Sequence, residues 1–331
     1  MEALLASDIF WVVFKSFLAV AIIFGLPLPF TWLERKIAGH IQVRPGPMRV
    51  GFHGVLQPIA DGLKLFLKED IIPTGADKFL FKAAPFMALI PYIAIFVAIP
   101  MSDEAYVSNM DIGVLYVLAI GGLSIYGIIM GGWASNSKYA LLGGLRAAAQ
   151  MISYEVAMGF AVIGVIMMAQ SLNMQDIVLA QQGGFLNWNI MPHKQLIAFF
   201  IFMVAGFAEA NRIPFDIPEG EGELGAGFHT EYSGMRFALF ALAEYAAMIS
   251  ISALAAVLFL GGWTSPVGFL DFVPGIVWFV LKTLFMVYLF MWTRFTWPRY
   301  RYDQLMTLGW KFLIPLGVAN VLITGLFVID F

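Results

Sequence analysis

Long apolar segments recur along the whole chain, with shorter polar segments between them. Runs of about 20 apolar residues cross a bilayer as helices, because a helix satisfies its backbone polar groups without water. We count eight such runs, at residues 9–33, 80–100, 112–132, 152–171, 195–210, 236–261, 272–292 and 309–329. The pattern predicts an all-α polytopic membrane protein, in which a bundle of about eight transmembrane helices forms a single membrane domain over residues 1–331.

One polar segment carries a helical pattern of its own. In GVLQPIADGLKLFLKEDI, residues 54–71, apolar side chains recur at helical spacing at Leu56, Ile59, Leu63 and Phe66. Charged side chains occupy the rest of the turn, so the segment predicts an amphipathic helix in the membrane interface. Such a helix either covers the end of the bundle or lines an opening for a ligand that arrives from the lipid.

Composition agrees with a membrane protein and narrows the possible chemistry. The chain is 60% hydrophobic and only 12% charged, with a mean hydropathy of +0.83, whereas about a quarter of the residues of soluble domains are charged. It has no cysteine, which excludes disulfides, cysteine zinc sites and iron–sulfur clusters held by thiolates. The four histidines lie scattered without the spacing of metal ligands. Any electron transfer is therefore expected on a partner.

Basic residues lie almost entirely in alternate polar segments. Segments 34–82, 133–151, 211–236 and 294–311 carry eight, two, two and four of the 19 Lys and Arg residues. The polar segments between them hold several carboxylates against a single Lys194. By the positive-inside rule, the four basic segments are cytoplasmic loops. Both termini are then expected on the outer side of the membrane.

Carboxylates at membrane depth form the first group of candidate functional residues. Glu244 lies within the run 236–261, and Glu155 and Glu209 lie at the cytoplasmic boundary of two other runs. An ionisable residue at such depth is costly and by default marks an ion or proton pathway. Burial and neighbouring carboxylates raise the pKa of a carboxyl group, and Arg or Lys lowers it, so a chain of such groups suits a proton relay.

Two glycine motifs have no catalytic meaning in this context. Gly220, Gly222 and Gly225 match the spacing of a dinucleotide-binding loop, but glutamates stand between them and would repel phosphate. Gly127 and Gly131 lie four residues apart in an apolar run, which predicts close helix packing.

Basic and aromatic residues gather in TWLERK, residues 31–36, and in WTRFTWPRYRYDQ, residues 292–304. Trp and Tyr at a membrane boundary are often simple interface anchors. The alternative is a wall for a flat amphipathic ligand, whose carbonyl groups the cations bind. Both interpretations stay open on the pattern alone.

Five segments, in order along nearly the whole chain, resemble a family of membrane proteins, the H subunits of proton-translocating NADH:quinone oxidoreductase, respiratory complex I. The mitochondrial counterpart is subunit 1 of that enzyme. The segments are ERKIAGHIQVRPGP, GVLQPIADGLKLFLKE, RAAAQMISYEV, AEANRIPFDIPEGEGELGAGFHTEYSGMRFALFALAEYA and PRYRYDQLMTLGWKFLIP. The resemblance implies a subunit that joins the membrane arm to the peripheral redox arm and forms the entrance and wall of the quinone chamber. Such a subunit is not catalytic alone.

The resemblance also implies where cofactors and site residues lie. FMN and iron–sulfur clusters would belong to partner subunits, quinone would be the substrate, and the partners would be the peripheral-arm quinone-site and iron–sulfur subunits, other membrane-arm subunits and lipid, with no nucleic acid. With Arg294 added from the basic and aromatic segment, the candidate quinone-binding residues are Glu34, Arg35, Asp61, Lys64, Arg212, Phe215, Asp216, Arg294 and Arg299. The candidate proton path comprises Glu155, Glu209, Glu219, Glu221, Glu223, Glu231 and Glu244 with the neighbouring Tyr154, Tyr232 and Tyr245.

Two other functions compete with this one. A self-contained ion-coupled transporter is expected to show an internal repeat with paired broken helices, and the carboxylates of this chain have no counterpart in its first three runs. A purely architectural anchor has no need of carboxylates at depth. NADH, reduced ferredoxin and a deazaflavin stay open as upstream donors, as do ubiquinone and menaquinone as acceptors.

Overall fold

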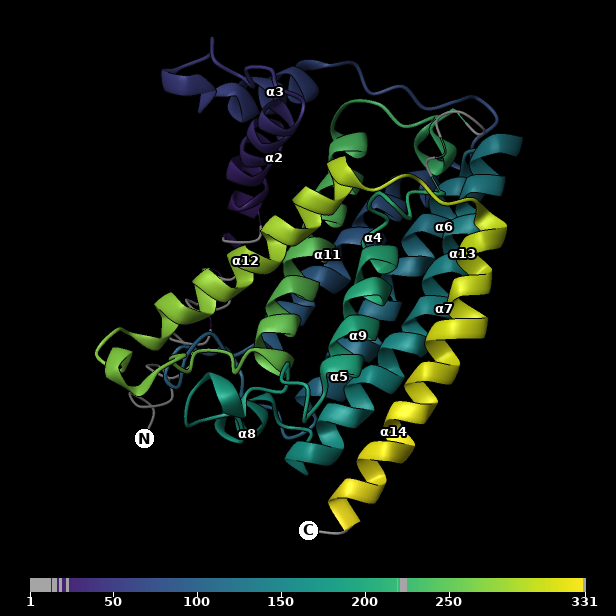
Figure 1. Ribbon diagram of the computed structural model, residues 1–331. Coiled ribbons are helices and arrows are strands. Elements are labelled where there is room, and N and C mark those ends of the chain that lie inside the picture. The colour runs from purple at the N-terminus through teal and green to yellow at the C-terminus, as the bar shows by residue number, and fades with distance from the viewer. Residues whose placement is uncertain are drawn as a thin grey trace, which may run out of the picture.

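The computed structural model describes residues 24–218, 220 and 225–329, together with residues 13, 17, 20 and 21 (Figure 1). Every regular element in these residues is a helix, and no strand occurs among them. The predicted all-α polytopic class is confirmed.

Most of the predicted spans appear as helices of the expected length. In the described part of the chain, six helical stretches are long and apolar enough to cross a membrane. They are α4 (Lys78–Ala98), α5 (Gly113–Gly122) with α6 (Ser124–Ala134), α7 (Lys138–Ala169), α11 (Gly234–Phe259), α12 (Gly275–Thr296), and α13 (Tyr302–Leu308) followed by η5 (Gly309–Leu313) and α14 (Ile314–Ile329). The shorter apolar helix α9 (Leu196–Glu209) matches the run 195–210. Much of the first part of the run 9–33 lies outside the described residues, which include its end in α2 (Pro27–Ile41).

Two expected loop boundaries need correction. Helix α7 begins at Lys138, so most of the predicted loop 133–151 is helical. Helices α12 and α13 likewise take up much of the predicted loop 294–311 and leave 297–301 between them. The expected boundaries followed the first charged residues, but long basic side chains reach water from a helix that continues past them. The alanines of segment 147–149 also favour a helix.

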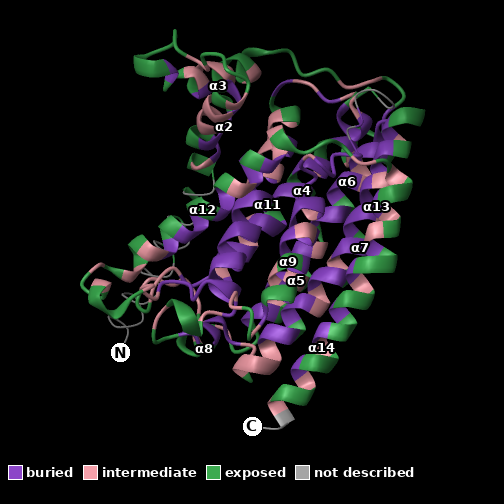
Figure 2. Cartoon of the chain, viewed as in Figure 1, coloured by how far each residue is buried: buried purple, intermediate pink, exposed green. Residues whose placement is uncertain are grey.

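The centre of the bundle consists of α4, α6, α7, α9 and α11, which pack against one another. Helix α11 is the most enclosed of the spans, whereas α14 exposes most of its surface at the edge (Figure 2). Small residues permit the closest approach between α4 and α6. A Cβ on Gly127 would lie 2.3 Å from the backbone nitrogen of Ala88, and one on Gly131 would lie 3.0 Å from Phe240. The packing role predicted for these two glycines is confirmed.

Helices α2 and α3 (Gln57–Leu67) lie at one end of the bundle, and α8 (Met174–Leu179) and the end of α14 lie at the other (Figure 1). The predicted helix within segment 54–71 is confirmed as α3, which contacts α2 and α11. Its apolar residues at Ile59, Leu63 and Phe66 are exposed in the chain alone. The apolar face is therefore available to lipid or to a partner.

Candidate functional site

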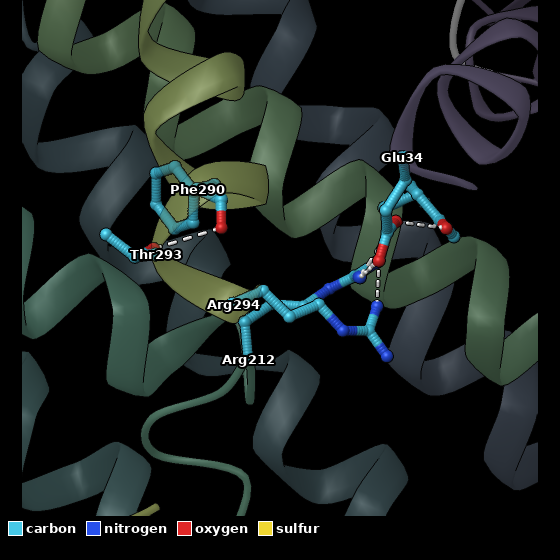
Figure 3. A network of polar contacts seen from close by, with 6 residues as sticks. Glu34, Arg212, Phe290, Thr293 and Arg294 are labelled. Atoms are coloured by element: carbon cyan, nitrogen blue, oxygen red, sulfur yellow. Dashed lines mark hydrogen bonds and ion pairs between the residues drawn. The ribbon is translucent and has the colours of Figure 1, made fainter. Parts of the chain in front are cut away.

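A buried carboxylate joins four parts of the chain at the end of the bundle that carries α2. Glu34 of α2 accepts hydrogen bonds at 3.1 and 3.2 Å from Arg212, which follows α9, and one at 2.6 Å from the hydroxyl of Tyr245 on α11. Arg294 of α12 also bonds Glu34, and the three charged side chains point toward one another (Figure 3). The guanidinium of Arg212 lies 4.3 Å above the Tyr245 ring. We call these four residues the Glu34 cluster.

Charge pairing inside the Glu34 cluster outweighs its burial. Glu34 and Arg212 are each only 4% exposed. Glu34 lies just beyond the predicted first span. Burial alone would raise its pKa, but Arg212 and Arg294 hold that pKa below the usual range. Burial alone would lower the pKa of Arg212, but Glu34 and Tyr245 raise it above its ordinary value. Both partners are therefore ionised near neutral pH.

A second charged pair lies between the segment after α9 and the segment after α12. Asp216 accepts a hydrogen bond at 2.7 Å from Arg299, and the carboxylate of this pair is the more buried partner. Beside it, the buried ring of Phe215 stacks on Tyr300, with 5.7 Å between ring centroids. Segment 292–304, which the sequence predicts as part of a wall for a flat ligand, is thus in contact with the segment after α9.

Three further quinone-binding candidates lie on α2 and α3. Arg35 bonds Asp61 at 2.5 Å, and Gln57 bonds the other oxygen of Asp61 at 3.1 Å. Lys64 lies one turn further along α3. This pair is half exposed, unlike Glu34, which is the neighbour of Arg35 in sequence. The contacts fasten α3 to α2 at the rim of the bundle.

The three carboxylates at depth lie around two small cavities. One, the Glu155 cavity, is lined by Glu155, Glu209 and Tyr92 among others. The second, the Glu244 cavity, is lined by Glu209, Glu244, Tyr92 and Ser124 among others. Each leaves about 20 Å³ for the centre of a water molecule, which is room for about one water. Glu209, the last residue of α9, lines both cavities and therefore lies between the other two carboxylates.

A break in the third span brings backbone close to these carboxylates. Helix α5 ends at Gly122 and α6 starts at Ser124, with Leu123 between them. A Cβ on Gly122 would lie 2.6 Å from an oxygen of Glu155, and one on Gly121 would lie 3.5 Å from an oxygen of Glu209. The absence of a side chain at Gly122 lets the Glu155 carboxylate approach the broken helix, whereas the Gly121 distance is an ordinary van der Waals contact.

The tyrosines assigned to the path donate their hydroxyls elsewhere. Tyr154 donates to the carbonyl of Leu305 at 2.9 Å, Tyr232 donates to a carbonyl of α4 at 3.2 Å, and Tyr245 donates to Glu34. Consecutive residues of a helix point about 100° apart, so neighbours in sequence do not share a partner. Tyr245 thus belongs to the Glu34 cluster, although its place beside Glu244 in the sequence groups it with the proton path.

Part of the predicted loop 211–236 lies outside the described residues. Glu219, Glu221 and Glu223 belong to this part, so their expected place in the proton path stays a prediction. Glu231 lies between η3 (Gly227–His229) and α11, immediately before the buried Tyr232.

Sequence reasoning missed three polar residues of this region. Tyr92 and Ser124 bond each other at 3.0 Å, and Gln150 donates to the carbonyls of Ala208 at 2.7 Å and Phe215 at 2.8 Å. Gln150 thereby fixes the turn that carries Arg212 against α7. For Tyr92 and Ser124 the available signal was a single polar residue among apolar neighbours at helical spacing. No three His, Asp or Glu side chains within the described ranges gather closely enough to hold a metal ion.

Comparison with known proteins places nearly the whole chain in one group. The family model of NADH dehydrogenase matches residues 14–325. The NADH-quinone oxidoreductase H subunit 2 of Rhizobium meliloti (strain 1021) is 58% identical over 98% of this chain and 99% of its own length. The protein of the same name from Rhizobium etli is 57% identical over 98% of this chain and 95% of its own length. The NADH-quinone oxidoreductase H subunit 1 of Geobacter sulfurreducens is 50% identical over 90% of this chain and 89% of its own length.

Proposed function

The chain belongs to the NADH dehydrogenase family and is an integral membrane subunit of a NADH-quinone oxidoreductase, and on this basis we propose that it walls the quinone chamber and begins a proton path. FMN and iron–sulfur clusters then lie in partner subunits, which agrees with a chain that has no cysteine. The basic loops face the cytoplasm of a bacterial inner membrane, and the termini face outward.

The quinone wall is the end of the bundle around the Glu34 cluster. A quinone has two carbonyl oxygens that accept hydrogen bonds and a flat ring that stacks on aromatic side chains. Arg294 and Arg299 are each about one third exposed and offer donors, while Phe215 and Tyr300 present stacked rings beside them. The exposed apolar face of α3 suits a mouth through which an isoprenoid tail enters from the lipid.

The observation that carries the proposal is the position of Arg212 between two carboxylates of different kinds. Arg212 bonds Glu34, and it also interacts electrostatically with Glu244, which lines a cavity shared with Glu209. One guanidinium therefore links the wall of the chamber to the carboxylates at depth.

Reduction of the quinone supplies the change in charge that this link transmits. The reaction consumes two electrons and two protons per quinol formed. Uptake of those protons, or the negative charge present before their uptake, alters the field at Arg212 and so the proton affinity of Glu244. Because the proton affinity of each carboxylate depends on the charge of its neighbour, the change passes through Glu209 to Glu155 as a coupled titration.

Amide substitution in the assembled oxidoreductase tests this function. Glu209→Gln and Glu244→Gln keep side-chain size but remove a titrating group. We expect both to lose inhibitor-sensitive, proton-coupled quinone reduction in proteoliposomes, while a soluble acceptor still draws electrons from the peripheral arm. Glu104→Gln, an exposed residue between α4 and α5, is the matched control and should behave as the unmodified enzyme. Full proton-coupled activity in both depth variants would falsify the proton path.

A further inference from the structure

Two hydroxyl groups stand at the junction between the Glu155 cavity and the Glu244 cavity. Tyr92 of α4 is buried, lines both cavities, and has its phenol oxygen 3.0 Å from the hydroxyl oxygen of Ser124. Ser124 is the first residue of α6 and lines the Glu244 cavity. Glu209 is the carboxylate that lines both cavities with Tyr92.

The phenol of Tyr92 has polar neighbours that packing alone does not require. Its phenol interacts electrostatically with Glu209, Glu155 and Glu244, in that order of strength. A buried water needs about three hydrogen-bond partners to stay ordered, and each cavity has room for about one. Two carboxylates and the Tyr92 hydroxyl provide three such partners in either cavity. Tyr92 and Glu209 are also the two polar side chains that line both cavities. Hydrogen bonds through them would connect a water in one cavity to a water in the other.

A hydroxyl group also does what a carboxylate alone cannot do at such a junction. It donates one proton and accepts another at the same oxygen, so it passes a proton on without a change in its own charge. A charged intermediate is costly at membrane depth, and a neutral carrier avoids that cost.

We propose that the Tyr92 hydroxyl, oriented by Ser124, connects the waters of the two cavities and carries protons past Glu209. As the Tyr92 oxygen takes a proton from a water in one cavity, its own proton leaves to the water or to the Glu209 carboxylate on the other side. The Ser124 hydroxyl accepts or donates the remaining hydrogen bond in each state. The proposal rests on the proton path proposed above and adds to it a group that carries no charge.

Ser124 is the first residue of α6 and directly follows Leu123 at the break between α5 and α6. Here the hydroxyl turns to Tyr92 and not to the backbone of its own helix. Ser124 thus links α6 to α4 by a hydrogen bond beside the carboxylates of the Glu244 cavity.

The test compares Tyr92→Phe with Tyr116→Phe in the intact, reconstituted oxidoreductase. Tyr116 of α5 also bonds across to α4, by donating to the carbonyl of Ala94 at 3.3 Å, but it lines neither of the two cavities. Both substitutions remove one hydroxyl that links the same two spans. Rates are normalised to the flavin content of the complex, so that a change in assembly is counted separately from a change in proton transfer.

We expect Tyr92→Phe to lower proton-coupled quinone reduction by about tenfold, less than the full effect of a positioned acid or base because a second water fills part of the space of the hydroxyl. The solvent deuterium isotope effect on the rate should rise, since proton transfer becomes rate-limiting, and reduction of a soluble acceptor should stay unchanged. Ser124→Ala should also lower the rate of proton-coupled quinone reduction and raise the isotope effect, each by a smaller factor. Tyr116→Phe should leave all three readouts unchanged.

Equal behaviour of Tyr92→Phe and Tyr116→Phe would overturn the proposal, whatever the behaviour of the carboxylates. A lower rate in Tyr92→Phe with no rise in the isotope effect would assign Tyr92 to packing alone and would overturn it as well. If Glu209→Gln retains full activity, the proton path itself fails. If Glu209→Gln is defective and Tyr92→Phe is not, only the role of Tyr92 fails.

Discussion

Loss of the Glu34 charge is the change with the largest calculable consequence. In Glu34→Gln the side chain keeps its size, but Arg212 loses its direct counter-ion while it stays only 4% exposed. Removing one partner of a buried ion pair costs about 3–5 kcal/mol. Arg294 is about one third exposed, so water screens its share of the loss and only Arg212 bears the full cost.

The assay is thermal inactivation of the purified complex, together with its quinone-reductase rate before heating. Glu34→Gln should unfold or dissociate at a clearly lower temperature and should bind quinone more weakly. The control is Asp303→Asn, whose pair with Arg301 at 3.3 Å has side chains 67% and 77% exposed, so that its loss costs about 0–1 kcal/mol. An equal, small shift in both variants would refute the reasoning that the Glu34 cluster is a buried ion network.

The Glu34 cluster also fixes the sign of a pH dependence. The folded pKa of Glu34 lies below its ordinary value of 4.5, so the stabilisation is complete above that value and is lost as pH falls through the folded pKa. The difference in thermal midpoint between the unmodified complex and Glu34→Gln should therefore be constant above about pH 5.5 and should shrink as the medium is made more acidic. A difference that grew on acidification would contradict this sign. Two glycine substitutions test the packing around the carboxylates. Gly122→Ala places a Cβ 2.6 Å from a Glu155 oxygen, so that carboxylate must move; we expect proton-coupled quinone reduction to fall while assembly is retained, as measured in proteoliposomes and by native electrophoresis. Gly127→Ala meets the backbone of Ala88 at 2.3 Å, where nothing flexible can yield, and should lower the amount of assembled complex. Gly159→Ala, with nothing within 4 Å, is the control for both; a defect in it equal to theirs would contradict the packing argument.

Local pattern predicted the elements well because a span is a property of consecutive residues. The runs 80–100 and 236–261 needed only their apolar length to be recognised, and the amphipathic helix in segment 54–71 needed only its spacing. Their ends were less accurate, since the charge of Arg146 does not end α7, which begins eight residues earlier in the chain. Lys138 begins that helix where the pattern predicts a loop.

The sequence pattern does not predict contacts between residues that are distant in the chain. Glu34 meets Tyr245 across 211 positions and Arg212 across 178, and which faces of α2 and α11 meet depends on how the whole bundle packs. Tyr92 gave no local signal of its role, because a single tyrosine in an apolar run is equally suited to packing. Its importance depends on Ser124, which belongs to another helix.

The most direct test of a link between quinone reduction and the carboxylates is a redox-induced infrared difference spectrum of the intact complex. We expect reduction of the bound quinone to change the carbonyl stretching band of protonated carboxyl groups, and we expect that change to be smaller in Glu209→Gln, which removes one titrating carboxyl, and unaltered in Glu104→Gln. An identical carboxyl band in Glu209→Gln and in the unmodified complex would contradict the proposal that quinone reduction alters the protonation of Glu209.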